Sequence, residues 1–101
     1  MKKIINGKKY DTETAKLIGA DSYGGSKSDF NYWEEALYKK VTGEFFLYGE
    51  GGAKSKYGIP IGDMWGYGEK IIPLTLSEAK AWAEEHMSVD NYESVFGIVE
   101  E

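Results

Sequence analysis

Large apolar side chains are most concentrated at Phe45–Tyr48, where they occupy both faces of a two-residue repeat. A strand that is apolar on both faces belongs in the middle of a sheet, because both of its sides must be covered. The next ten residues, 49–58, include four glycines, and glycine weakens a strand because it adds no side-chain packing. The pattern therefore predicts a central strand over Phe45–Tyr48 that ends before a glycine-rich loop.

The first thirty residues predict a hairpin, a short helix and a loop. An Asn-Gly pair in the middle of Lys3–Tyr10 suits a type I′ turn, since both residues tolerate positive φ. Asp11 or the following threonine can cap a helix over Thr12–Ile18, with a glycine just past its end. Small polar residues and glycines then predict a surface loop over Gly19–Asp29.

The segment Phe30–Val41 fits two structures. As a helix the segment presents one apolar stripe. As a strand its successive side chains alternate between the two faces of a sheet, and each face holds both apolar residues and an acid. The stripe consists of Phe30, Trp33, Leu37 and Val41. We favour a strand over Glu35–Lys40, because a central strand at Phe45–Tyr48 needs a partner and the adjacent segment is the easiest to bring alongside.

Glycines recur between residues 49 and 68, interleaved with large apolar residues. We expect an extended segment over Ser55–Ile61, a turn at Gly62–Asp63 and a further strand over Glu69–Leu74. Pro60 places the extended segment at an edge, because proline cannot donate a ladder hydrogen bond.

The clearest helix is predicted over Thr75–Met87. Thr75 and Glu78 have the spacing of a capping box, and the apolar positions that follow recur at helical spacing. The inward face is predicted to contain Leu76, Ala79, Trp82, Ala83, His86 and Met87. Burial of Trp82 should stabilise this packing by roughly 2–3 kcal/mol.

A shorter helix is predicted at the end of the chain, capped by Asp90, running through Phe96 and stopped by Gly97. Together these elements predict an α+β fold. We expect one domain over residues 1–101, with a small antiparallel sheet built from hairpins and the capped C-terminal helix packed on one face.

Charge is unevenly distributed along the chain. Its net charge is −5, and residues 1–57 hold ten lysines and eight acids, whereas residues 58–101 hold two lysines and nine acids. The two parts therefore carry +2 and −7. The chain has no arginine, which is the residue that phosphate and guanine recognition favours. The composition argues against direct nucleic-acid binding and favours either a solvated acidic surface or a negative patch for a basic partner.

Several other classes are excluded by composition. Without cysteine, neither a disulfide framework nor a thiolate metal site can form. No apolar run approaches the length of a membrane span, and the N-terminus lacks a signal-peptide core. We therefore expect a cytoplasmic protein without cofactor, metal or membrane association.

Two motifs are candidates for chemical sites. Gly49–Ser55 resembles a phosphate-binding loop, but Ala53 replaces the required glycine and the sequence that follows does not begin a helix. His86 is the single histidine, and the acids next to it in sequence point elsewhere on a helix, so a partly buried residue at a helix end is the simpler interpretation. Because no convergent nucleophile, base or ligand set is found, we expect that the protein is not an enzyme.

Aromatic rings in glycine-rich segments beside acids are typical of protein-binding surfaces. The alternative is that these rings cover the small core. The candidate partner-binding residues are Tyr57, Asp63, Trp65, Tyr67, Glu69, Glu84, Glu85, Asp90 and Glu93. We expect the acids to gather into one docking face for a basic host protein. The second hypothesis is a structural or self-associating accessory protein that dimerises through a sheet edge or the aromatic loops.

Four motifs resemble a group of small proteins carried by phages, plasmids and conjugative elements of low-GC Gram-positive bacteria. They are NGKKYDTETAK, GEFFLYGEGG-x-x-S-x-Y, KIIPLT-x-x-EA-x-x-WAEE and Y-x-x-x-FG, and they span nearly the whole chain. Small acidic proteins of this setting include anti-CRISPR inhibitors of Cas nucleases. The resemblance implies an anti-defence protein, and it supplies no catalytic residues. The acidic second half and the loop aromatics lead to our first hypothesis, a non-enzymatic inhibitor that sterically blocks a basic host surface. That surface could be the nucleic-acid or PAM groove of a Cas nuclease, where acidic groups would stand in for phosphates.

Overall fold

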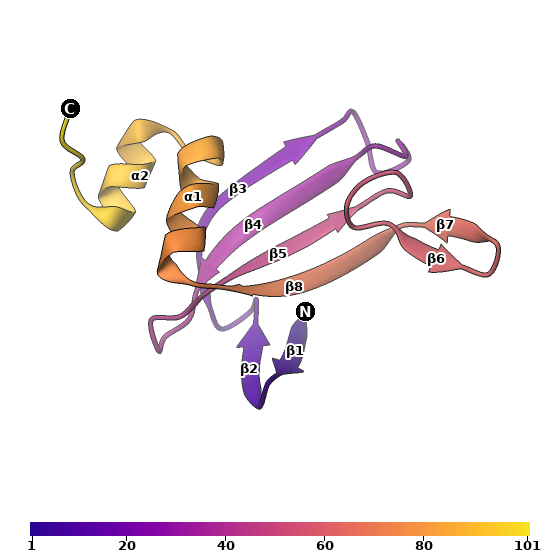
Figure 1. The fold of residues 1–101 in the computed structure, drawn as a ribbon, viewed down its shortest axis with the longest axis horizontal. Helices are drawn as coiled ribbons and strands as arrows, with labels where there is room; N and C mark the ends of the chain where they lie inside the picture. The colour runs from indigo at the N-terminus through magenta and orange to yellow at the C-terminus, as the bar shows by residue number, and fades with distance from the viewer.

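The computed structural model describes residues 1–101 and has an α+β fold, as predicted (Figure 1). Its main sheet is antiparallel, with strand order β3–β4–β5–β8. The main-sheet strands are β3 (Lys16–Tyr23), β4 (Trp33–Lys39), β5 (Phe45–Gly51) and β8 (Gly68–Leu74). Two separate hairpins are formed by β1 (Lys2–Ile5) with β2 (Lys8–Asp11), and by β6 (Ile59–Ile61) with β7 (Met64–Gly66). The helices are α1 (Leu76–His86) and α2 (Val89–Phe96).

Strand β5 lies inside the sheet between β4 and β8, as its two-sided apolar pattern predicts. On one face α1 covers the sheet, and the apolar side chains of both form the larger core (Figure 1). This core contains Leu37, Phe45, Leu47, Ala79, Trp82 and Ala83. The preferred strand over Glu35–Lys40 is confirmed by β4, because Leu37 packs inward there while Tyr38 faces the opposite side.

The opposite face of the sheet is covered at one end only, by the β1–β2 hairpin. The ring of Tyr10 meets Phe46 edge-on at 5.5 Å between centroids, and Tyr38 stacks on Phe46 at 5.2 Å. A two-stranded hairpin is marginally stable by itself, so these contacts anchor β1 and β2. The other end of this face is partly covered by side chains, since Tyr32 is 9% exposed and the side chain of Glu50 is 12% exposed.

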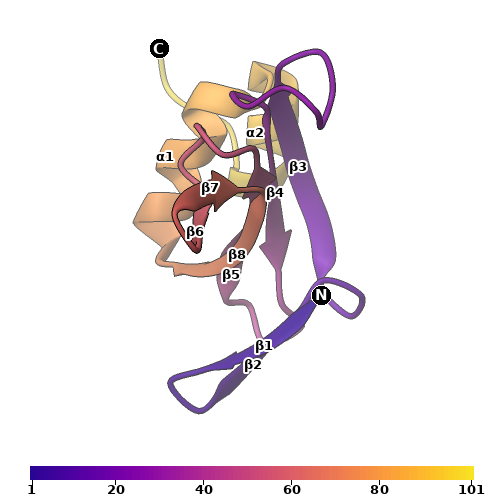
Figure 2. The ribbon, with the colours of Figure 1, turned by 90° about the vertical axis from the view of Figure 1, so that its right-hand side faces the viewer.

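The β6–β7 hairpin, residues 59–66, projects from the end of the sheet as an arm (Figures 1 and 2). Its strands turn at Gly62, where φ is +60°, which confirms the predicted turn. Neither helix covers the arm, and Ile61, Met64 and Trp65 are exposed on it.

The capping box of α1 is present. The Thr75 hydroxyl accepts a hydrogen bond from the Glu78 amide at 3.1 Å, and the Glu78 carboxylate accepts one from the Thr75 amide at 2.9 Å. Leu76, predicted to point inward, is instead 54% exposed. The first turn of a helix projects beyond the sheet edge more readily than its middle, and here α1 starts directly at the end of β8.

The predicted cap of α2 is corrected by the structure. Ser88, not Asp90, is the N-cap, and its hydroxyl accepts a hydrogen bond from the Asn91 amide at 3.2 Å. Asp90 lies in the first turn, where a carboxylate also stabilises the helix dipole. Gly97 ends the helix with φ of +97°, as predicted.

The predicted helix over Thr12–Ile18 is wrong. The Asp11 carboxylate accepts a hydrogen bond from the Glu13 amide, and the Asp11 carbonyl accepts one from Ala15, so the backbone makes one turn. Strand β3 then begins at Lys16, and the predicted loop over Gly19–Asp29 is wrong as far as Tyr23. Pairing with β4 overrides the weak strand propensity of this polar, glycine-containing segment.

The prediction that the chain leaves the sheet at Gly49 is also wrong, because β5 continues to Gly51. A Cβ at Gly49 would lie 2.0 Å from the Tyr57 ring, and one at Gly51 would lie 2.3 Å from the Ser55 hydroxyl. Because these two glycines have no Cβ, the loop that carries Ser55 and Tyr57 can pack directly against β5. The extended segment predicted over Ser55–Ile61 forms a strand only at Ile59–Ile61, and hydrogen-bonded turns precede it.

Neither helix is both long enough and apolar enough to cross a membrane.

Candidate functional site

The end of the sheet away from the β1–β2 hairpin carries one acid from each of three adjacent strands. Glu34 on β4 is directly opposite Glu50 on β5, and Glu50 is directly opposite Glu69 on β8. All three face away from the helices, because they alternate with the residues that pack under α1. We call Glu34, Glu50 and Glu69 the carboxylate ladder.

Each carboxylate of the ladder accepts a hydrogen bond from a tyrosine. Tyr32 donates to Glu34, Tyr67 to Glu50 at 2.8 Å, and Tyr48 to Glu69 at 2.8 Å. The only ion pair of the ladder joins Lys27 Nζ to a Glu50 oxygen at 3.6 Å. The ladder is thus fixed in place by hydroxyl donors, while its negative charge is largely uncompensated.

The close approach of Glu34 and Glu50 changes the pKa values of these two acids. Burial raises the pKa of Glu50, and the neighbouring Glu34 carboxylate raises it further. The pKa of Glu34 is lowered by hydrogen bonds with Glu50 and Tyr32. The Glu34 carboxylate raises the pKa of Tyr32 to about 12. Two adjacent carboxylates that resist simultaneous ionisation are at higher energy than isolated ones, and like charges directly opposite in a sheet destabilise it.

The structure divides the predicted binding residues into separate groups. Tyr67 and Glu69 belong to the ladder and its donors, and Asp63 and Trp65 are exposed on the β6–β7 arm. The four helix acids, Glu84, Glu85, Asp90 and Glu93, lie in the layer on the other side of the sheet. The acids of the second half therefore do not form one continuous face.

Tyr57 is not available for a partner, because it is only 5% exposed. Its hydroxyl donates to the buried carboxylate of Glu35, and burial together with this acid raises the pKa of Tyr57. Tyr57 therefore covers the core and is not part of a contact surface.

Two members of the ladder were missed by the sequence interpretation. The sequence pattern predicts that the strand ends at Tyr48 and that Glu50 lies in a loop, although Glu50 continues the alternation of Phe46 and Tyr48. Glu34 shares a face with Ala36 and Tyr38, and its alternation was visible, but the register that sets it beside Glu50 was not. A strand extended by two residues would have placed Glu50 on this face, but only the register of β4 against β5 places Glu34 opposite it.

A second polar cluster lies on the helix side. His86 Nδ1 is 2.8 Å from Asp21 Oδ2, and His86 Nε2 is 3.6 Å from Glu85 and 4.0 Å from Glu35. The prediction that the neighbouring acids point away from His86 is wrong for Glu85. Glu35 is satisfied by Lys56, Tyr57 and Trp82, so the cluster holds α1, β3, β4 and the 52–58 loop together.

The residues around His86 also line a cavity of about 490 Å³. Ser55 lines it, but its hydroxyl donates to the Gly52 carbonyl and accepts from the Tyr57 amide, so it is occupied as a turn residue. No three His, Asp or Glu side chains are arranged to hold a metal ion.

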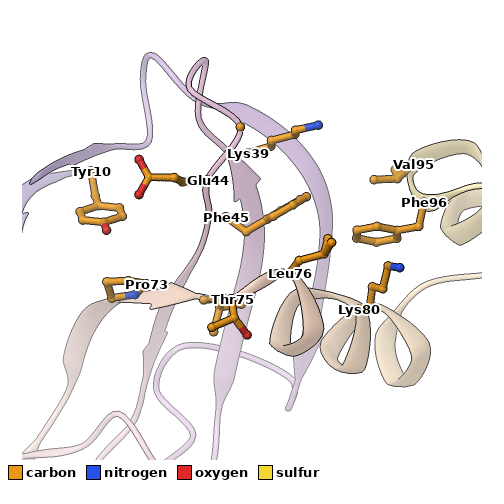
Figure 3. A pocket seen from close by; sticks show the side chains of 12 residues that line it. Tyr10, Lys39, Glu44, Phe45, Pro73, Thr75, Leu76, Lys80, Val95 and Phe96 are labelled. Atoms are coloured by element: carbon orange, nitrogen blue, oxygen red, sulfur yellow. The ribbon is translucent and has the colours of Figure 1, made fainter.

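The largest cavity, about 550 Å³, lies where α1 begins, between the ends of β5 and β8 and helix α2 (Figure 3). Phe45, Leu76 and Phe96 form its apolar side, and Lys39 and Lys80 stand beside them. Glu44 on the other side is neutralised by Lys8 and Lys40, whose ammonium groups lower its pKa to about 2. No buried acid, lysine or histidine faces this cavity.

No protein-family model, curated protein or solved structure matches this chain.

Proposed function

We propose that the protein is a non-enzymatic binding module that docks its carboxylate ladder onto a basic surface of another protein. The observation that carries this proposal is the direct cross-strand opposition of Glu34, Glu50 and Glu69. Like charges in this register cost folding free energy. Lysine or arginine side chains of a partner would remove that cost, so binding gains free energy from relieved repulsion as well as from new ion pairs.

The tyrosines around the ladder support protein recognition. Tyr32, Tyr48 and Tyr67 fix the carboxylates by their hydroxyl groups, so few side-chain rotamers remain to be immobilised on binding. Tyr67 is 37% exposed, so its ring adds contact area at a small entropic cost. A preorganised row of acids between aromatic rings suits a basic groove better than it suits a small ligand.

A basic groove of this kind is what a nuclease presents to nucleic acid. Adjacent strands lie about 4.8 Å apart, so the three carboxylates form a row of negative charges. The phosphates of a DNA strand also form a row of negative charges. The resemblance to mobile-element proteins supports the same class of partner. We therefore propose a host defence nuclease of the Cas type, blocked in the host cytoplasm by occupation of its nucleic-acid or PAM groove.

The test is the DNA binding of a purified Cas9-type effector complex from a low-GC Gram-positive host, measured with increasing amounts of this protein. We expect DNA binding to be lost at a one-to-one ratio of this protein to the complex. The inhibition should weaken when the salt concentration rises from about 0.1 M to about 0.5 M, because salt screens exposed charges. Equal inhibition at both salt concentrations would contradict electrostatic docking. Inhibition by trace amounts would indicate an enzyme, and no inhibition of any tested complex would contradict the choice of partner.

A further inference from the structure

The β6–β7 arm presents apolar side chains around an acid that has no partner. Ile61, Met64 and Trp65 are each more than half exposed, and Asp63 lies in the turn between the strands and takes part in no ion pair. Contiguous exposed apolar groups on a projecting element mark an interaction site. A matching surface should be concave, apolar and positively charged at its rim.

The cavity of Figure 3 has these properties. Phe45, Leu76 and Phe96 supply an apolar wall, and its volume is about 550 Å³, whereas a cavity of about 150 Å³ is enough for a benzene ring. The ammonium groups of Lys39 and Lys80 form no ion pair. Lys80 is one of only two lysines among residues 58–101, which hold nine acids. Together with Lys39 it gives the cavity a positively charged rim.

We propose that the arm of one copy of this protein inserts into this cavity of a second copy. Trp65 and its apolar neighbours would contact Phe45, Leu76 and Phe96, while Asp63 would pair with Lys39 or Lys80. The arm cannot reach the cavity of its own chain, because the arm and the start of α1 lie toward opposite ends of the molecule (Figure 1).

Side-chain insertion fits the arm better than strand addition does. Pro60 has no amide hydrogen, so the outer edge of β6 cannot accept a further strand along its length. Because the two surfaces are different, the contact is head-to-tail and generates open chains or rings instead of a closed two-fold dimer. A single short hairpin also buries less than the roughly 1,200 Å² of a stable interface, so the association should be weak and concentration-dependent. The carboxylate ladder belongs to neither surface.

Sedimentation equilibrium over a wide concentration range tests the proposal. We expect the average mass of the intact chain to rise from 11.3 kDa with increasing concentration. Trp65→Ala removes the arm's ring, and Leu76→Glu places a negative charge on the cavity wall at a helix start, where a carboxylate is tolerated. Each variant alone should remain monomeric. Circular dichroism is the control that tests whether each variant is folded. Val89→Ala, which removes another exposed apolar group, is the matched control and should associate normally.

Mixing the two variants is the decisive step. Trp65→Ala retains an intact cavity and Leu76→Glu retains an intact arm, so the mixture should form one-to-one dimers and no larger species. The proposal is overturned if the intact chain stays monomeric at every concentration, if either variant associates as the intact chain does, or if the mixture remains monomeric.

Discussion

The indole nitrogen of Trp82 on α1 donates a hydrogen bond of 3.0 Å to the carboxylate of Glu35 on β4, across 47 residues of sequence. Glu35 is almost completely buried and also accepts from Tyr57 and Lys56. One charged group thereby joins the helix layer, the central part of the sheet and the loop after β5.

Trp82→Ala should therefore be among the most destabilising substitutions. It removes a buried ring and one of the donors to Glu35, so we expect the free energy of unfolding to fall by about 3–5 kcal/mol. Chemical denaturation measures this change. The matched variant is Trp65→Ala, which removes an exposed ring and should change stability by less than about 0.5 kcal/mol. Similar losses in the two variants would contradict the structure.

Glu35 should make stability depend on pH on the acid side. Burial acts to raise the pKa of Glu35, but hydrogen bonds from Lys56, Tyr57 and Trp82 outweigh it and leave the pKa below its ordinary value. An acid with a lowered folded-state pKa stabilises the fold above its unfolded-state pKa, and this contribution is lost as the pH falls through the folded-state value.

Glu35→Gln should consequently be less stable than the intact chain at pH 7, and the difference should shrink as the pH falls from about 5 to about 3. Thermal unfolding at a series of pH values measures both chains. Asp21 and Glu44 also have lowered pKa values, and the comparison cancels their contributions. A difference that stays constant with pH would show that Glu35 is not charged in the folded protein.

Glu50→Gln should behave in the opposite way. The pKa of Glu50 is raised by burial and by Glu34, and a raised pKa gives a contribution that is present at low pH and lost as the pH rises. Removing this acid should therefore raise the melting temperature at pH 7 and change it little near pH 3. A lower melting temperature at pH 7 would contradict the repulsion described for the ladder.

Gly49→Ala should displace the loop that carries Tyr57. The added Cβ would lie 2.0 Å from the Tyr57 ring, and overpacking of this kind costs about 1–3 kcal/mol or more. The control is Gly25→Ala, where no atom lies within 4 Å of the added Cβ and no loss is expected. Denaturation midpoints of the two variants give the comparison.

The local patterns predict the regular elements well. The Asn-Gly turn, the two-sided strand at Phe45 and the Thr75 capping box each depend on neighbouring residues, and all three are present. Strand β3 was missed because Lys16–Tyr23 is mostly exposed and becomes a strand through its pairing with β4. Short-range patterns do not contain that long-range contact.

The candidate site was less predictable for the same reason. The ladder depends on the register of three strands, and the Asp21–His86 contact joins residues 65 positions apart. Exposed Trp65 and buried Tyr57 are both aromatic residues of a glycine-rich region, and only the glycine at position 49 explains why Tyr57 can fold back onto the sheet.

The most direct test of the account compares two triple variants that remove the same charge. The first is Glu34→Gln, Glu50→Gln and Glu69→Gln in the ladder, and the second is Glu84→Gln, Glu85→Gln and Asp90→Asn on the helices. The measurement is the affinity of each for a nuclease complex that the intact chain inhibits. We predict a loss of about tenfold or more for the ladder variant and little change for the helix variant. Equal losses, or a loss confined to the helix variant, would contradict docking through the ladder.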